Sequence, residues 1–86
     1  MLLRHLIGRS IRKLRTAQGR TLREVAETAG VSLAHLSAIE RGLAEASSEV
    51  IAAISRALGI GLGELLDEIR HHTHEYEARG SYTLAA

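Results

Sequence analysis

Cysteine, proline, phenylalanine and tryptophan are all absent from this sequence of 86 residues, and Tyr76 and Tyr82 are its only aromatic residues. Without cysteine the chain can form neither a disulfide nor a thiolate zinc site, which favours a reducing, cytoplasmic location. No apolar run approaches the roughly 20 residues of a membrane-spanning helix, so no membrane partner is expected. Leucine, isoleucine, valine and alanine must therefore supply nearly all of the buried surface, a composition that favours a small helical core.

Acidic residues are missing from the first part of the chain. Residues 1–23 hold seven Arg and Lys and no Asp or Glu, a formal charge of +7, whereas residues 24–86 hold four basic and ten acidic residues, a charge of −6. A concentrated basic end suits a polyanion such as nucleic acid, and an acidic remainder limits indiscriminate binding. A basic helix that is merely solvated is the alternative, and charge alone does not separate the two.

Apolar residues recur at helical spacing in five stretches of the sequence. Glycines and hydroxyl residues separate these stretches, as helix stops and N-caps. Thr21 stands three residues before Glu24, a capping box that predicts the start of the second helix. The pattern predicts an all-α fold of five helices. The first covers roughly residues 3–18, the second ends before Gly30, and the third, the candidate recognition helix, covers about residues 32–41. The fourth is capped by Ser47 and ended by Gly59, and the fifth begins near Leu62 with an end that the pattern leaves open. Residues 1–78 are expected to form one domain and residues 79–86 a flexible tail.

The second and third predicted helices are joined by a tight turn, Ala29-Gly30-Val31. Such a pair can form a helix-turn-helix, which presents its second helix to the major groove of DNA. The stretch "IRKLRTAQGRTLREVAETAGVSLAHLSAIERG" resembles the Cro/C1-type (XRE) helix-turn-helix family in its Leu-Arg, Thr-Leu-x-Glu-Val-Ala, Gly-Val-Ser and Leu-Ser-x-Ile-Glu-Arg-Gly elements. "SSEVIAAISRALGI" and "LGELL" are similar to the family's fourth and fifth helices, although Ala46 stands where the family often has proline. The resemblance covers about residues 4–70 and implies a lambda-repressor-like DNA-binding domain.

Within this family the sequence is similar to actinobacterial regulators of Clp protease genes. The similarity lies in "TLREV", "VSL", Leu-Ser-x-x-Glu-Arg-Gly, "EASSE" and the terminal "LAA". In that group the C-terminal Ala-Ala resembles a signal read by the Clp machinery, so the resemblance implies a turnover signal at Leu84, Ala85 and Ala86. A disordered end that happens to carry alanine remains the alternative.

The outward side of the third helix holds the candidate base-reading residues. At 100° per residue, Leu36 and Ile39 point into the domain and the remaining positions point outward or to the flanks. Alanine allows the helix to lie deep in the groove and can contact thymine methyl groups, and Ser37 can donate or accept a hydrogen bond. We therefore expect five base-reading residues: Leu33, Ala34, His35, Ser37 and Ala38. Because the family often has a polar residue at position 33, sequence preference is expected to depend on apolar contacts and DNA shape. Packing of Leu33 and His35 against neighbouring helices is the alternative.

Candidate phosphate contacts lie at two helix N-termini, where backbone N–H groups and the helix dipole favour anions, and beside them. They are Arg12, Arg20, Thr21, Arg23, Ser32 and Arg41. Arg12 could equally be a solvated charge, and Arg41 could instead contact a guanine. The family resemblance also implies that Arg15 and Glu40 form a structural ion pair between the first and third helices.

The last predicted helix carries a candidate dimer interface. Leu65, Ile69, His72 and Tyr76 form a stripe that extends beyond what one small core requires. A single helix-turn-helix binds DNA weakly, so we expect a homodimer on double-stranded DNA with an inverted-repeat operator, its half-sites about 34 Å apart.

Catalytic and metal-binding functions are not supported by the sequence. His71, His72 and His74 are interpreted as exposed histidines at a helix end, where they suit the dipole, rather than as metal ligands. His35 beside Ser37 lacks the third group of a catalytic triad, so neither an enzyme nor a cofactor is expected. Two alternatives to a DNA-binding regulator remain: the antitoxin of a toxin–antitoxin pair, and an interaction module that has lost DNA binding. The basic residues at positions 1–23 argue against the second.

Overall fold

The computed structural model of the chain describes residues 2–79, with side chains described as far as His71. Its five helices are α1 (Leu3–Ala17), α2 (Leu22–Ala29), α3 (Leu33–Glu40), α4 (Ser48–Ala57) and α5 (Leu62–Arg79). All regular elements of this part of the chain are helices, so the prediction of an all-α, five-helix fold is confirmed. The predicted tail at residues 80–86 lies outside the described residues.

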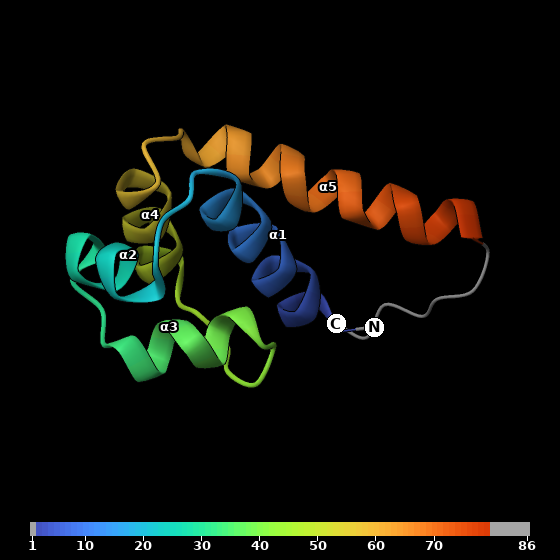
Figure 1. Cartoon of the computed structure of the whole chain (residues 1–86). Helices are drawn as coiled ribbons and strands as arrows, with labels where there is room; N and C mark the ends of the chain where they lie inside the picture. Colours follow the sequence, from blue (N-terminus) through green and yellow to red (C-terminus); the bar gives the residue numbers. More distant parts are fainter. Residues whose placement is uncertain (1, 80–86) are drawn as a thin grey trace.

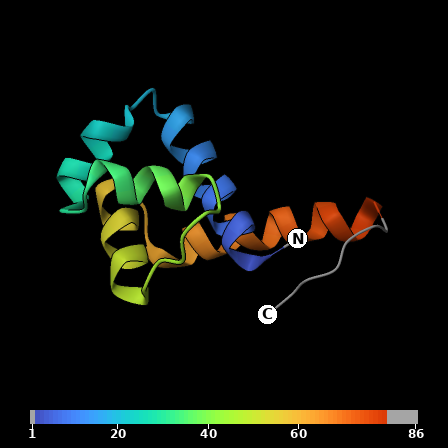
Figure 2. The same ribbon diagram turned by 90° about the horizontal axis from the view of Figure 1, so that it is seen from below.

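Helix α1 lies between α5 and α3, and α2 and α4 pack together at its C-terminal end (Figure 1). The last turns of α5 project beyond the other four helices (Figures 1 and 2). One apolar core joins all five helices, and its fully buried members are aliphatic, as the lack of aromatic residues requires. They include Leu6, Ile11, Val25, Leu36, Ile54 and Leu65.

Side-chain caps begin three of the helices. Thr21 and Glu24 form the predicted capping box at the start of α2. Ser32 caps α3 and Ser47 caps α4, where their hydroxyl oxygens accept hydrogen bonds from backbone N–H groups at 3.0 and 3.1 Å. Gly30 ends α2 in the left-handed region, with φ 72°, which sets the tight turn into α3.

A glycine allows α1 and α3 to cross closely. A β-carbon at Gly8 would overlap the carbonyl oxygen of Ile39 and lie 2.7 Å from that of Glu40. On the same part of α1, buried Ser10 satisfies its hydroxyl by donating to the Leu6 carbonyl at 2.8 Å. The backbone of α3 therefore rests directly on the backbone of α1, which fixes the position of the third helix.

Candidate nucleic-acid interface

Helix α3 has one buried side and one open side. Leu36 and Ile39 are 0% and 1% exposed, which gives the helix the orientation expected from its spacing. Leu33 is 38% exposed and Ala34 is also exposed, so part of the Leu33 side chain is open to solvent. Figure 2 shows α3 in front of the other helices, not covered by any of them. The described part of the chain therefore leaves this helix free to enter a groove.

The other predicted base-reading residues are less open. His35, Ser37 and Ala38 are half-buried, which keeps partial packing of His35 as an alternative. Arg41, the C-cap of α3, is exposed and its Nε lies 3.4 Å from the Ser37 carbonyl oxygen. The outward side of α3 is thus mostly apolar, and Ser37 and His35 are its polar side chains between positions 33 and 38.

The N-terminus of α2 already holds a carboxylate. The Thr21 N–H donates to Glu24 Oε1 at 2.8 Å, and the Thr21 hydroxyl oxygen accepts from the Glu24 N–H at 3.1 Å. The hydrogen bond from the Thr21 N–H to the Glu24 carboxylate, and after it the nearby Thr21 side chain, lower the pKa of Glu24. The Thr21 N–H is therefore not available to a DNA phosphate, which leaves only its exposed hydroxyl for the predicted contact.

Arg20 has hydrogen-bond acceptors within the domain. Its guanidinium donates to the carbonyl oxygen of Ala57 and, at 3.4 Å, to the Thr28 hydroxyl. Gln18 donates to the neighbouring Leu58 carbonyl at 2.8 Å. These carbonyl groups at the C-terminus of α4 lack helical partners and attract cations and donors. The Arg20 side chain therefore caps α4, and a phosphate contact at Arg20 stays a prediction.

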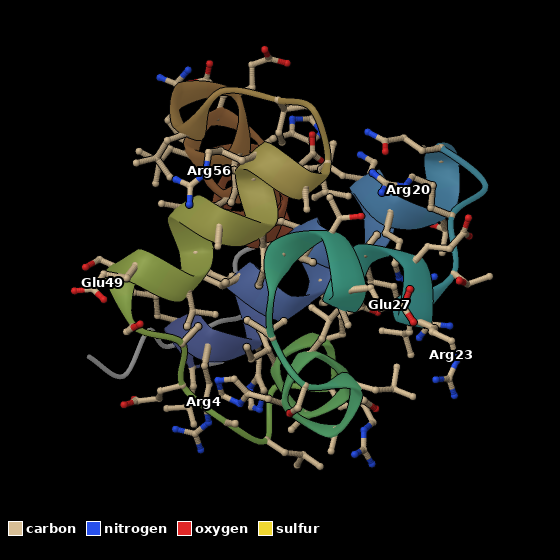
Figure 3. The ribbon with its side chains drawn as sticks, turned by 90° about the vertical axis from the view of Figure 1, so that its left-hand side faces the viewer. Arg4, Arg20, Arg23, Glu27, Glu49 and Arg56 are labelled. Atoms are coloured by element: carbon tan, nitrogen blue, oxygen red, sulfur yellow. The ribbon has the colours of Figure 1, made fainter. Side chains whose placement is uncertain are left out.

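Arg23, in contrast, is exposed, and Figure 3 shows its guanidinium pointing away from the ribbon. Ser32 is also exposed, and its hydroxyl oxygen accepts a hydrogen bond from the His35 N–H at the start of α3. The structure thus leaves Arg23 and Ser32 accessible on the α2 and α3 side of the molecule.

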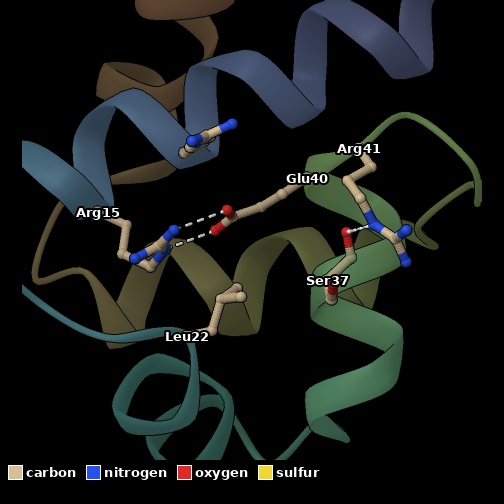
Figure 4. A pocket seen from close by; sticks show the side chains of 6 residues that line it. Arg15, Leu22, Ser37, Glu40 and Arg41 are labelled. Carbon is tan, nitrogen blue, oxygen red and sulfur yellow. Dashed lines mark hydrogen bonds and ion pairs between the residues drawn. The ribbon is translucent and has the colours of Figure 1, made fainter.

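Arg15 and Glu40 form a two-pronged ion pair between α1 and α3 (Figure 4). Arg15 Nε and Nη2 donate to the two Glu40 carboxylate oxygens at 2.7 and 3.0 Å, and the side chains are only 12% and 5% exposed. The third donor, Nη1, bonds the Arg20 carbonyl at 2.8 Å. The hydrogen bond to Glu40 raises the pKa of Arg15 against the opposing effect of burial. The pair holds the end of α3 and the loop before α2 against α1.

The predicted dimer stripe on α5 needs correction. Leu65 is fully buried and Ile69 is half-buried against the same core, so Leu65 is not available to a second subunit. The exposed leucines of this helix are Leu62 and Leu66, at 45% and 54%. Leu65 and Ile69 have the same i, i+4 spacing as Leu62 and Leu66, so the spacing alone does not show which pair faces inward.

Several predicted features fall outside what the structure describes. The side chains of His72, His74 and Tyr76 are outside the described residues, and so are Leu84, Ala85 and Ala86. Among the described residues, no group of three or more His, Asp or Glu side chains could hold a metal ion. None of the helices in this part of the chain is both long enough and apolar enough to cross a membrane.

Comparison with protein families gives a match to the helix-turn-helix family over residues 11–65. The transcriptional regulator ClgR of Mycobacterium tuberculosis is 51% identical over 65 residues, which are 76% of this chain and 58% of that protein. The regulator SinR of Bacillus subtilis is 39% identical over 75 residues, 86% of this chain and 66% of that protein. The chain thus matches about three fifths of the length of ClgR.

Solved structures give the same result. The clp gene regulator ClgR from Corynebacterium glutamicum superposes with a TM-score of 0.86 at 39% identity, over 93% of this chain and 85% of that one. The restriction-modification controller protein C.AhdI from Aeromonas hydrophila gives a TM-score of 0.70 at 31% identity, over 72% of this chain and 94% of that one. The position of α3 in this chain therefore belongs to a shared architecture.

Proposed function

The chain belongs to the Cro/C1-type (XRE) helix-turn-helix family, and from this we propose that it is a transcriptional regulator that binds double-stranded DNA with α3 in the major groove. One observation carries the proposal. Helix α3 buries Leu36 and Ile39 and is fixed on α1 by the contact at Gly8 and the Arg15–Glu40 pair, while its opposite side remains uncovered. A rigid helix with a free side is what major-groove recognition requires. The relatives are transcriptional regulators rather than enzymes.

Sequence preference is proposed to depend mainly on apolar contacts. Leu33 and Ala34 are exposed, and positions 33–38 hold no Arg, Lys, Asn or Gln that could make a two-pronged hydrogen bond to a purine. The methyl groups of Leu33 and Ala34 suit the methyl group of thymine, while Ser37 and His35 supply the polar contacts. Arg23, Ser32, Arg12 and Arg41 are proposed to contact phosphates, which position the protein without reading sequence.

The functional unit is proposed to be a homodimer on an inverted repeat. One helix-turn-helix makes few base contacts, and two copies with recognition helices about 34 Å apart bind successive turns of one side of the duplex. The exposed Leu62 and Leu66 on α5 supply an apolar surface for the second copy. Because the named relatives include clp gene regulators, genes of the Clp protease system are the first candidate targets, and the chain would act in the cytoplasm at the nucleoid.

A protein partner is the second candidate function. SinR, one of the structural relatives, was solved as a complex with the SinI protein, with a TM-score of 0.69 at 39% identity over 84% of this chain and 72% of that one. The exposed leucines on α5 could take a different protein in place of a second copy, as an antitoxin or interaction module would. Recognition of Leu84, Ala85 and Ala86 by the Clp machinery remains a separate proposal.

The deciding experiment selects bound duplexes from a random DNA pool at two salt concentrations. We expect an inverted repeat whose half-sites are centred one helical turn apart. Ser37→Ala should change the selected sequence, whereas Arg23→Ala should weaken binding to all sequences alike. Failure to enrich any sequence, at either salt concentration, would contradict the proposal and favour the protein-partner function.

A further inference from the structure

A hollow of about 240 Å³ opens between α1, α2 and α3, beside the outward side of α3 (Figure 4). Its lining comes from all three helices and from the C-cap of α3: Arg12, Arg15, Leu22, Ser37, Glu40 and Arg41. Ser37 belongs both to this hollow and to the predicted base-reading side of α3. A group bound here would therefore lie next to the groove that α3 occupies.

The lining of the hollow has an excess of positive charge that no ion pair of the described residues neutralises. Three arginines and one glutamate line it, a formal charge of +2. Arg15 is committed to Glu40 and to the Arg20 carbonyl, so these two opposite charges cancel inside the domain. The remaining charges are those of Arg12 on α1 and Arg41 at the end of α3, both exposed. No carboxylate of the described residues forms an ion pair with either one.

We infer that Arg12 and Arg41 together bind a single phosphate of the DNA backbone in this hollow. The inference rests on the proposed DNA-binding function and assigns the contact of Arg12, on α1, to the same phosphate as that of Arg41. Guanidinium groups on two walls of one hollow can give charge-assisted hydrogen bonds to the same phosphate. Because α1 and α3 are locked together by the Arg15–Glu40 pair, such a phosphate would fix the register of α3 along the groove.

The Arg15–Glu40 pair is also what makes the hollow suitable for an anion. Glu40 alone would place a negative charge on the lining and repel a phosphate. With Arg15 Nε and Nη2 bonded to both of its carboxylate oxygens, Glu40 lines the hollow without an uncompensated charge. Arg15 is thus a positioning residue, and Arg12 and Arg41 are the phosphate-contacting residues.

The salt dependence of binding tests whether the two arginines share one phosphate. Each phosphate contact contributes about 0.9 to the slope of log Kobs against log salt on duplex DNA. Arg12→Ala and Arg41→Ala should each weaken operator binding about tenfold, the effect of one charge-assisted hydrogen bond. The double variant should lose about 0.9 of the slope in total. Losses of about 0.9 in each single variant and about 1.8 in the double variant would show that the two arginines contact separate phosphates. A slope in the double variant equal to that of the wild type would show that they contact no phosphate. Either result overturns the inference.

A scan of operators that carry one neutral methylphosphonate in place of a phosphate locates the contact. One position in each half-site should weaken binding of the wild type and have no further effect on the Arg12→Ala/Arg41→Ala variant. Arg56→Ala is the matched control, because Arg56 is exposed on α4 and does not line the hollow (Figure 3). The control should keep the methylphosphonate effect and the salt slope of the wild type.

The scan also separates failure of this inference from failure of the proposed function. If the wild type binds the operator while no methylphosphonate position has an effect that depends on both arginines, that result overturns the shared phosphate alone. A wild-type protein that binds no duplex at either salt concentration would overturn the proposed function and this site together. Unfolding midpoints of the exposed-arginine variants should match the wild type, which excludes misfolding as the cause of lost binding.

Discussion

Arg20 and Arg23 lie three positions apart in the sequence, yet their side chains have different environments. Arg20 and Gln18 donate to the carbonyl groups of Ala57 and Leu58, so the loop between α1 and α2 caps the C-terminus of α4. Arg23 points into solvent from the first turn of α2 (Figure 3). The first arginine therefore stabilises the fold, and the second is available to a polyanion.

Exchange of each arginine for alanine should separate these roles. Arg20→Ala should lower the free energy of unfolding by about 2 kcal/mol, because the Ala57 carbonyl loses a charged donor, and should leave the salt slope of DNA binding unchanged. Arg23→Ala should leave stability unchanged and reduce that slope by about 0.9. Urea unfolding and binding titrations at several salt concentrations measure both quantities. A reduced slope with unchanged stability for Arg20→Ala would instead support the phosphate contact predicted from the sequence.

The sequence could predict side-chain roles that depend on neighbours within one helix. Leu36 and Ile39 face inward because of their spacing, and Thr21 pairs with Glu24 because both lie in one helical turn. Arg20 could not be placed in this way, because its acceptor on Ala57 lies 37 positions further along the chain. The Arg15–Glu40 pair, 25 positions apart, was expected only from the family resemblance.

At the scale of whole helices, the crossing of α1 over α3 depends on Gly8. Gly8→Ala should lower the free energy of unfolding by about 3 kcal/mol, because its methyl group would overlap the Ile39 and Glu40 carbonyl oxygens and neither backbone can move freely. The helices would have to separate, so operator affinity should fall as well. Thermal unfolding and DNA titration test this. Gly63→Ala on α5 is the control, because its added methyl group meets nothing within 4 Å. Equal stability of the two variants would contradict the close crossing.

The capping box at the start of α2 should make stability depend on pH. The pKa of Glu24 is lowered by hydrogen bonds from Thr21, so its contribution is fully present above the unfolded-state pKa and is lost as pH falls through the folded-state pKa. Glu24→Gln keeps a capping-box acceptor that does not titrate. The stability difference between wild type and variant should therefore shrink as pH falls from neutral to about 3. Urea unfolding at each pH measures it, and a difference that does not change with pH would contradict the role of the carboxylate.

Helix positions were predictable, but which side of α5 faces inward was not. The five helices follow from apolar spacing and from caps such as Ser32 and Ser47, whose hydrogen bonds are local. On α5, the pairs Leu62/Leu66 and Leu65/Ile69 have the same spacing, so the sequence allowed either pair to be the inward one. The contacts of α5 with α1 and α4 determine which pair faces inward, and they bury Leu65.

For the molecule as a whole, the positive charge of residues 1–23 overstates what is available to DNA. Most of the seven basic residues have partners within the domain. Arg4 donates to the Gly42 carbonyl at 2.9 Å, Lys13 pairs with Glu68 at 2.8 Å, and Arg15 and Arg20 are held as described above. A charge count alone could not show this, because it does not contain the tertiary partners. The contact surface that we propose for DNA is correspondingly smaller and centres on Arg12, Arg23 and α3.

Assembly into a dimer should depend on the exposed leucines of α5. Leu66→Asp should convert a two-chain species into a monomer, because it places a charge in an apolar contact between subunits. Stability of the folded chain should change little, since Leu66 is 54% exposed in the single chain. Leu43→Asp, at a leucine 67% exposed in the loop after α3, is the matched control and should remain dimeric.

Light scattering after size exclusion, at high micromolar protein concentration, measures the mass of each variant. The wild type and the Leu43→Asp control should give the mass of two chains, and Leu66→Asp that of one. Loss of the dimer should also weaken binding to the full inverted repeat far more than binding to an isolated half-site, because only the full site gains from joining two copies. A wild type that is monomeric under these conditions would contradict the dimer. A dimer that survives Leu66→Asp would move the interface away from this side of α5.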